Sequence, residues 1–316
     1  MHLKSIRHKL FLWLAIASFS FAAFSCTDSR TAVLHDPSSK HAIAYSDTLL
    51  EIDIRSPQGF LYDVQKDCFI FAKGQEKVVY PGSTSKLVTA LYALSLLDPF
   101  EVVTAGDELD FVKPGSSVAY IKKGHSLTVE MLVEGMLIPS GNDAAYVLAA
   151  AVGYEIGGHD LSVSEAIEAF TEGMNAYARS VLGLCGTVLT VPDGYADEAH
   201  YTTVEDMALV AKEAMADPII AKYAGTYRDS VRYESGETNT WVNTNNLLDS
   251  ESVYYSPYAI GLKTGSISEG YSLLFAFRFE DGREYIAGVF GAKEKNDRFE
   301  DAHQIIDCVF AEMSVQ

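Results

Sequence analysis

Residues 272–290 read SLLFAFRFEDGREYIAGVF, and this stretch decides the fold class. Two apolar, strand-like runs, 272–279 and 284–290, flank the turn-forming Glu280-Asp281-Gly282, so the stretch predicts an antiparallel hairpin. A further strand-like run at 260–266 precedes it. The C-terminal part of the chain therefore predicts an antiparallel sheet rather than alternating parallel strands and helices.

A second hairpin is predicted near the other end of the chain, where apolar runs at 59–63 and 68–72 flank a polar turn. The pattern between the two hairpins is mainly helical. Helices are expected after Pro81-Gly82, over 128–137, 142–152 and 160–182, after a capping box at Thr202-x-x-Glu205, and over about 297–313. This order predicts an α+β fold in which an antiparallel sheet of about five strands is flanked by helices, with a helical subdomain.

The charge balance argues against two classes of partner. The 316 residues carry 24 Lys and Arg against 43 Asp and Glu, a formal net charge of −19. Phosphates would be repelled by so acidic a chain, which argues against a nucleic-acid partner. The same charge argues against electrostatic docking on an anionic membrane surface.

The N-terminus predicts export. Residues 1–25 combine a basic start with a 15-residue apolar run at 10–24, which suits a signal peptide better than a membrane span. Ala23-Phe24-Ser25-Cys26 resembles the lipobox of bacterial lipoproteins, so lipidation of Cys26 is expected, with plain secretion or an uncleaved anchor as alternatives. Residues 26–45 are polar and aperiodic, and are expected to form a tether.

Three cysteines remain, and no Cys-x-x-Cys spacing occurs. Their odd number and wide spacing argue against a metal or redox site, and no metal or cofactor is expected. The sequence leaves open a disulfide among Cys68, Cys185 and Cys308.

Three short motifs carry candidate chemistry, and the first is Ser83-Thr84-Ser85-Lys86. Ser83 falls at a predicted helix start, and Lys86 lies one turn later on the same face. Free backbone N–H groups at a helix start can stabilise an oxyanion. The motif therefore supplies a hydroxyl nucleophile and a candidate amine base.

The other two motifs add polar groups to this set. Ser140-Gly141-Asn142, in a break between predicted helices, offers a hydroxyl and an amide; Lys263-Thr264-Gly265, near the end of a predicted strand, offers a second amine. Gly265 would let a substrate backbone approach closely. Taken singly, each motif also suits a helix cap or a surface lysine, but all three in this order favour a serine–lysine catalytic site.

The flanking residues resemble a known family. Residues 80–87, 137–145 and 261–266 are similar to D-alanyl-D-alanine carboxypeptidases of low molecular mass. So are residues 115–118 and 192–194, and the resemblance extends over roughly 45–315. It implies a β-lactamase/transpeptidase-like fold, with one catalytic domain at 46–316 and a helical insertion at about 98–230. Many relatives carry a further C-terminal β domain, which is not expected here.

The resemblance also implies roles for individual residues. Ser83 would be the acylated nucleophile, Lys86 its base, Ser140 a proton relay to the leaving group and Asn142 a group that orients substrate. The remaining implied site residues bind substrate or the oxyanion: Lys263, Thr264 and Gly265 for substrate, the backbone N–H groups of Ser83 and Ser266 for the oxyanion, and Arg298 for the terminal carboxylate. A solvated arginine is the alternative for Arg298.

A lysine base needs a lowered pKa, because a free lysine titrates at about 10.4. Burial and a neighbouring ammonium would both lower the pKa of Lys86, and Lys263 is the candidate neighbour.

The resemblance implies an exported serine-type carboxypeptidase of the cell envelope. It would remove the terminal D-alanine from peptidoglycan stem peptides ending in D-Ala-D-Ala, with β-lactams as inhibitors. The alternatives are a D,D-endopeptidase that cuts cross-links, a β-lactamase, and a non-catalytic wall-binding protein. A β-lactamase is less favoured. Class A β-lactamases carry a Glu-x-x-Leu-Asn loop that positions the deacylating water, and no such sequence occurs between Ser140 and Lys263.

Overall fold

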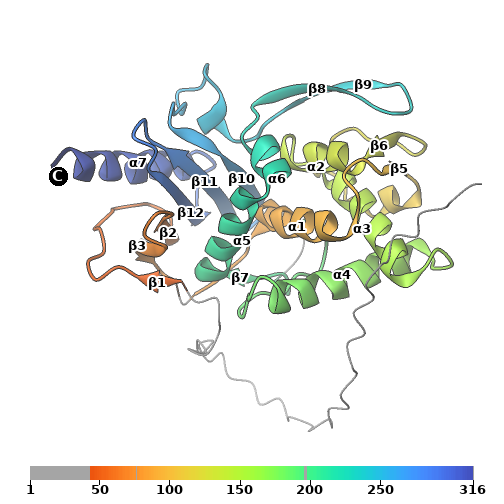
Figure 1. Ribbon diagram of the computed structural model, residues 1–316, viewed down its shortest axis with the longest axis horizontal. Helices are drawn as coiled ribbons and strands as arrows, with labels where there is room; N and C mark the ends of the chain where they lie inside the picture. Colours follow the sequence, from red (N-terminus) through yellow and green to blue (C-terminus); the bar gives the residue numbers. More distant parts are fainter. Residues whose placement is uncertain (1–42, 76, 196–197, 316) are drawn as a thin grey trace, which may run out of the picture. The chain divides into compact units, whose positions relative to one another are not determined.

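The computed structural model describes residues 43–75, 77–195 and 198–315, which all belong to one compact unit. Its centre is a six-stranded sheet in the order β1-β3-β2-β12-β11-β10 (Figure 1). The strands are β1 (Ala44–Tyr45), β2 (Gln58–Asp63), β3 (Cys68–Lys73), β10 (Ala259–Ile267), β11 (Gly270–Arg278) and β12 (Glu284–Ala292). The predicted α+β architecture and both predicted hairpins are confirmed.

The sheet has one strand more than expected. The strand β1 pairs with β3 in parallel, whereas the other neighbouring strands are antiparallel. Its residues fall in the segment expected to be a tether, but the Tyr45 ring packs 5.1 Å from that of Phe69. This contact joins residues 44–45 to the sheet. The predicted signal peptide and Cys26 lie outside the described residues.

Alternating side chains give the sheet two buried faces. On β2, Phe60 and Tyr62 belong to one apolar core and Leu61 to another. Helix α7 (Asp297–Val315) packs on one face through Phe299 and its following turns. Helix α5 (Val204–Ala216) packs on the other. Both faces are therefore covered by helices, as the α+β prediction requires.

The middle of the chain forms the predicted helices. They are α1 (Lys86–Leu96), α2 (Val129–Leu137), α3 (Asn142–Gly157), α4 (Val163–Ser180) and α5; a further short helix, α6 (Pro218–Ala224), was not predicted. The predicted cap of α5 is wrong by one residue: Thr203 Oγ1, not Thr202, accepts a hydrogen bond from the Asp206 N–H, at 3.1 Å. Thr202 is buried instead, with its hydroxyl 2.7 Å from that of Thr187.

Several short strands were not predicted. Two pairs are β4 (Val78–Val79) with β7 (Thr202–Thr203), and β5 (Val102–Thr104) with β6 (Ser126–Thr128). The hairpin of β8 (Arg228–Arg232) and β9 (Thr238–Val242) is longer, and Figure 1 shows it extending toward β6. Each of its strands buries a single side chain, Val231 or Trp241, so the sequence carries too weak an apolar alternation to predict it.

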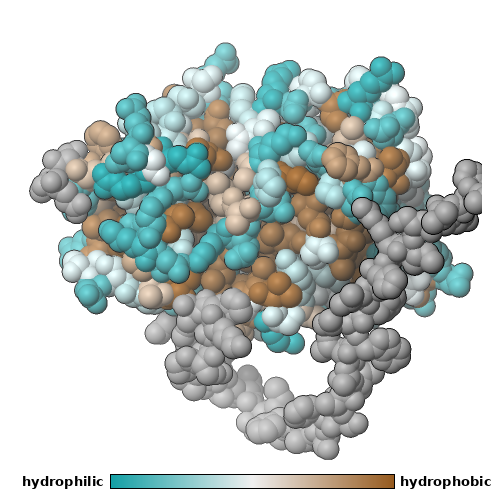
Figure 2. All heavy atoms as spheres, in the orientation of Figure 1, coloured by the Kyte–Doolittle hydropathy of each residue, from teal (hydrophilic) through white to brown (hydrophobic). Residues whose placement is uncertain are grey.

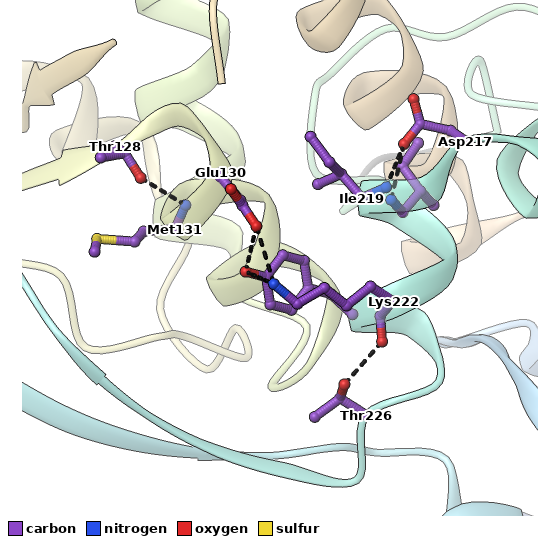
Figure 3. Close-up of polar contacts among 9 residues, drawn as sticks. Thr128, Glu130, Met131, Asp217, Ile219, Lys222 and Thr226 are labelled. Atoms are coloured by element: carbon purple, nitrogen blue, oxygen red, sulfur yellow. Dashed lines mark hydrogen bonds and ion pairs between the residues drawn. The ribbon is translucent and has the colours of Figure 1, made fainter. Parts of the chain in front are cut away.

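Polar contacts fix α2 against α6 (Figure 3). Glu130 Oε1 accepts hydrogen bonds from Lys222 Nζ at 3.1 Å and from the Tyr223 hydroxyl at 2.8 Å. Thr128 and Asp217 cap the N-termini of the two helices. The end of α2 leads directly into residues 140–142, so this packing helps to place the second motif.

The surface in Figure 2 mixes hydrophilic and apolar side chains. Within the described residues, no helix is both long and apolar enough to cross a bilayer. Cys68 and Cys308 are free thiols in the structure.

Helix α7 is anchored by a buried carboxylate, and this gives a test of the fold. Asp301 accepts hydrogen bonds from the backbone N–H groups of Arg55 and Ser56, at 2.7 and 2.8 Å. Asp301→Ala leaves the buried Ser56 N–H and the part-buried Arg55 N–H without a partner, so the free energy of unfolding should fall by about 2–4 kcal/mol in urea denaturation. The control Asp307→Ala, on an exposed position of α7, should cost under about 0.5 kcal/mol. Equal losses in both variants would contradict this assignment.

Candidate active site

Ser83 and Lys86 meet at the start of the first long helix. Ser83 lies in a 3₁₀ turn, Gly82–Ser85, that continues directly into α1, whose first residue is Lys86. Lys86 Nζ lies 2.8 Å from Ser83 Oγ. It also donates to Asn142 Oδ1 at 2.7 Å and to the Asp193 carbonyl oxygen at 2.6 Å. A neutral amine that keeps the last two bonds directs its lone pair at the Ser83 hydroxyl.

The second motif forms the break between α2 and α3. Ser140 has a positive φ of 63°, a strained backbone conformation for a residue other than glycine. The Asn142 N–H donates to the Ser117 carbonyl oxygen at 2.8 Å, and the Gly141 N–H to that of Gly135 at 3.1 Å. These bonds hold the turn so that Ser140 and Asn142 line the same cavity as Ser83.

The third motif lies on the edge strand β10. Lys263 is only 1% exposed, which rules out a surface lysine, and its Nζ donates to the Thr264 carbonyl oxygen at 3.2 Å. The Thr264 hydroxyl lies 2.5 Å from that of Thr244. A Cβ on Gly265 would lie 2.5 Å from the Pro81 carbonyl oxygen. The close approach at Gly265 is therefore to the protein's own backbone, and its role in substrate binding stays a prediction.

The expected oxyanion donors come from neighbouring elements. A Cβ on Gly82 would lie 3.3 Å from the Ser266 backbone nitrogen, so the turn that carries Ser83 packs against the end of β10. Both Ser83 and Ser266 line the cavity.

Arg298 is buried, and the solvated alternative is wrong. It is 1% exposed in the first turn of α7. Its Nη1 donates to the Gly265 carbonyl oxygen at 2.8 Å and to the Ser266 hydroxyl and Ser272 carbonyl oxygen at 3.3 Å. No carboxylate of the described residues pairs with it, and burial lowers its pKa to about 10. A buried cation without an anionic partner suits an anionic ligand.

These groups surround a cavity of about 310 Å³. Its lining within the described residues is Ser83, Gly115, Ser116, Ser117, Ser140, Asn142, Tyr195, Thr244, Asn246, Thr264, Ser266, Lys295 and Arg298. The two motif lysines lie behind this lining, where both side chains are almost fully buried. All the predicted site residues therefore gather in one region of the fold.

Burial dominates the electrostatics of both lysines. It lowers the pKa of Lys86 to about 8, and the carboxylates of Asp193 and Asp143 oppose that shift. The pKa of Lys263 is held well below its ordinary value, first by burial and then by the charges of Lys86 and Arg298. The predicted fall in the pKa of Lys86 is thus found, but its cause is burial; the repulsion between the two amines lowers the pKa of Lys263 instead.

Comparison with known proteins gives the family. Residues 44–294 match the model of a peptidase family described as Peptidase_S11, D-alanyl-D-alanine carboxypeptidase. The chain belongs to this carboxypeptidase family.

Curated members of the family share about a third of the aligned residues. The chain is 30% identical over 247 residues to the D-alanyl-D-alanine carboxypeptidase DacF of Bacillus subtilis, covering 77% of this chain and 59% of that protein. It is 31% identical over 252 residues to a D-alanyl-D-alanine carboxypeptidase of Streptomyces strain K15, covering 77% of this chain and 82% of that protein. The chain thus spans little more than half of the Bacillus relative.

Solved structures agree with the family assignment. The Streptomyces K15 DD-transpeptidase superposes with a TM-score of 0.74 at 30% identity, covering 83% of this chain and all of that one. A D-alanyl-D-alanine carboxypeptidase from Mycobacterium tuberculosis superposes with a TM-score of 0.70 at 25% identity, covering 85% of this chain and 96% of that one. The predicted fold class is confirmed.

Sequence reasoning gave no role to several groups at this carboxypeptidase-family site. The Asp193 carbonyl oxygen holds Lys86, and a Cβ on Gly194 would lie 2.1 Å from the Gly82 carbonyl oxygen. Asp143 accepts from the Ala119 N–H at 2.8 Å and so fixes the wall that includes residues 115–117. The resemblance at 115–118 and 192–194 was the available signal. The described residues contain no cluster of three or more His, Cys, Asp or Glu side chains that could hold a metal ion.

Proposed function

We propose that this protein is a serine-type D-Ala-D-Ala carboxypeptidase that removes the terminal D-alanine of peptidoglycan stem peptides through an acyl-enzyme on Ser83. One observation carries the proposal: Lys86 Nζ lies 2.8 Å from Ser83 Oγ while two other oxygens hold the same nitrogen. A serine is inert at neutral pH without a base, and this amine is the adjacent one.

In acylation, neutral Lys86 takes the Ser83 proton as Oγ attacks the carbonyl carbon of the penultimate D-alanine. The backbone N–H groups of Ser83 and Ser266 stabilise the oxyanion. Asn142, which touches Lys86 and lines the cavity, orients the peptide. The burial that lowers the pKa of Lys86 makes the neutral base available near pH 8.

In the second half of acylation, the C–N bond breaks and Ser140 relays the proton held by Lys86 to the departing amine, which leaves Lys86 neutral again. Thr264 and Arg298 bind the terminal carboxylate, and the buried Lys263 supports the proton network beside Lys86. Water then attacks the acyl-enzyme and frees Ser83, with Lys86 acting again as base. A β-lactam resembles the dipeptide and carries a carboxylate, so it should acylate Ser83 by the same steps.

The location follows from the substrate. Peptidoglycan lies in the cell envelope, so a carboxypeptidase of this family acts outside the cytoplasm. A single catalytic domain over residues 46–316, with a signal peptide at 1–25 and attachment through a lipid on Cys26, fits this location. Mass spectrometry of the mature N-terminus distinguishes a lipidated Cys26 from plain secretion.

The direct test follows D-alanine release from an N-acyl pentapeptide ending in D-Ala-D-Ala. Ser83→Ala should lower the release by at least about a thousandfold. The same change at Ser95, whose hydroxyl bonds to the Tyr92 carbonyl oxygen on α1 away from the cavity, should leave the rate unchanged. Release by Ser83→Ala at the native rate would refute the nucleophile. Products from cross-linked dimers, measured in parallel, separate carboxypeptidase from endopeptidase activity.

The base role predicts a pH profile. Lys86 must be neutral to accept a proton, and its neutral fraction grows as pH rises through a pKa of about 8. The rate of acylation by benzylpenicillin should therefore rise between about pH 7 and 9 and level off above that range. A rate that still increases tenfold per pH unit near about pH 10 is the behaviour of an ordinary lysine, and would contradict the role.

A further inference from the structure

The cavity has a charge pattern opposite to that of the whole chain. Its described lining contains two cations, Lys295 and Arg298, and no carboxylate, although the chain carries 43 acidic residues and a net charge of −19. Lining groups of one sign concentrate ligands of the other sign. The substrate's terminal carboxylate accounts for one of these cations, and the second cation calls for another explanation.

The two cations differ in freedom. Arg298 is buried, and its Nη1 is held by the Gly265 carbonyl oxygen, the Ser266 hydroxyl and the Ser272 carbonyl oxygen. Lys295 is exposed and forms no ion pair with the described residues. The guanidinium of Arg298 is therefore held in place against the end of β10, whereas the ammonium of Lys295 can move at the rim of the cavity.

The position of Lys295 relates it to the leaving group. The proposed function assigns Arg298 to the carboxylate of the terminal residue, which is the residue that departs, and Arg298 contacts the hydroxyl of Ser266, a proposed oxyanion donor. Lys295 precedes Arg298 by three residues, just before α7, and lines the same cavity. It flanks the place of the departing residue rather than that of the acyl residue.

We propose that Lys295 binds a second carboxylate on the leaving residue, so that the enzyme prefers substrates whose departing D-residue carries two carboxylates. This inference rests on the proposed function. Terminal D-alanine has a single carboxylate, which Arg298 and Thr264 take. An acidic D-residue at the end of a linear peptide has a free second carboxylate, and so has a cross-linking diamino diacid that is the last residue of its own stem. Both fit the pair of cations. The bonds made and broken are those of the carboxypeptidase reaction.

The test compares matched leaving groups. N-acyl peptides ending in D-Ala-D-Glu and D-Ala-D-Gln differ only in the second charge of the departing residue. A cross-linked dimer whose departing diamino diacid has its second carboxylate either free or amidated tests the cross-link as the source of that carboxylate. At low salt, the native enzyme should cleave the D-Glu peptide with a kcat/KM about fivefold above that for D-Gln. The preference should shrink as salt rises, since screening weakens an exposed pair.

Three variants assign the preference to one side chain. Lys295→Gln should lower the D-Glu to D-Gln ratio to about one, while Lys295→Arg should keep the ratio. The control Lys293→Gln removes the same charge from an exposed position that does not line the cavity, and should also keep it. Benzylpenicillin labelling of Ser83 verifies that each variant is folded.

The outcomes separate this inference from the function on which it rests. A native ratio of one, or a ratio that survives Lys295→Gln, overturns the role of Lys295 while D-Ala-D-Ala cleavage stands. Loss of the ratio in Lys293→Gln as well shows a general charge effect, and also overturns it. Absence of cleavage of every peptide together with no penicillin labelling refutes the carboxypeptidase instead.

Discussion

The site depends on the burial of two amines that contact no carboxylate among the described residues. Water and an acidic partner both stabilise an ammonium, and Lys86 and Lys263 are removed from the first without gaining the second. The consequence is a lowered pKa at both, to about 8 at Lys86. Burial of an unpaired amine is destabilising by itself, but here it gives Ser83 a neutral base. Carboxylates at Asp143 and Asp193 limit the effect without pairing with the amine.

The fold creates this burial by bringing three distant segments into contact. The turn at residues 82–85 packs on β10, and Gly265 permits that approach because a Cβ would meet the Pro81 carbonyl oxygen at 2.5 Å. From the other side, Gly194 fits against Gly82 so that the Asp193 carbonyl oxygen reaches Lys86. The sheet holds β10 in place, and α7 holds Arg298. Loss of packing at any of these contacts would admit water to the lysines and restore an ordinary pKa.

Much of the site could be predicted because its motifs are local. The spacing of Ser83 and Lys86 sets their contact once a helix forms, and the strand hairpin at 272–290 consists of two apolar runs around a clear turn. Groups from loops could not be found this way: Thr244 and Lys295 reach the cavity through packing of segments whose own sequence has no distinctive pattern. The cap of α5 could not be predicted for the same reason. Thr202 is buried beside Thr187, and this contact leaves Thr203 as the capping residue.

The central claim is that Lys86 is a buried amine with a lowered pKa, and NMR titration of the lysine side chains tests it most directly. In protein labelled with ¹³C at lysine Cε, the resonance lost in Lys86→Ala should titrate with a midpoint of about 8, well below those of the exposed lysines. A midpoint for that resonance at about 10.4, the value of a free lysine, would contradict the account.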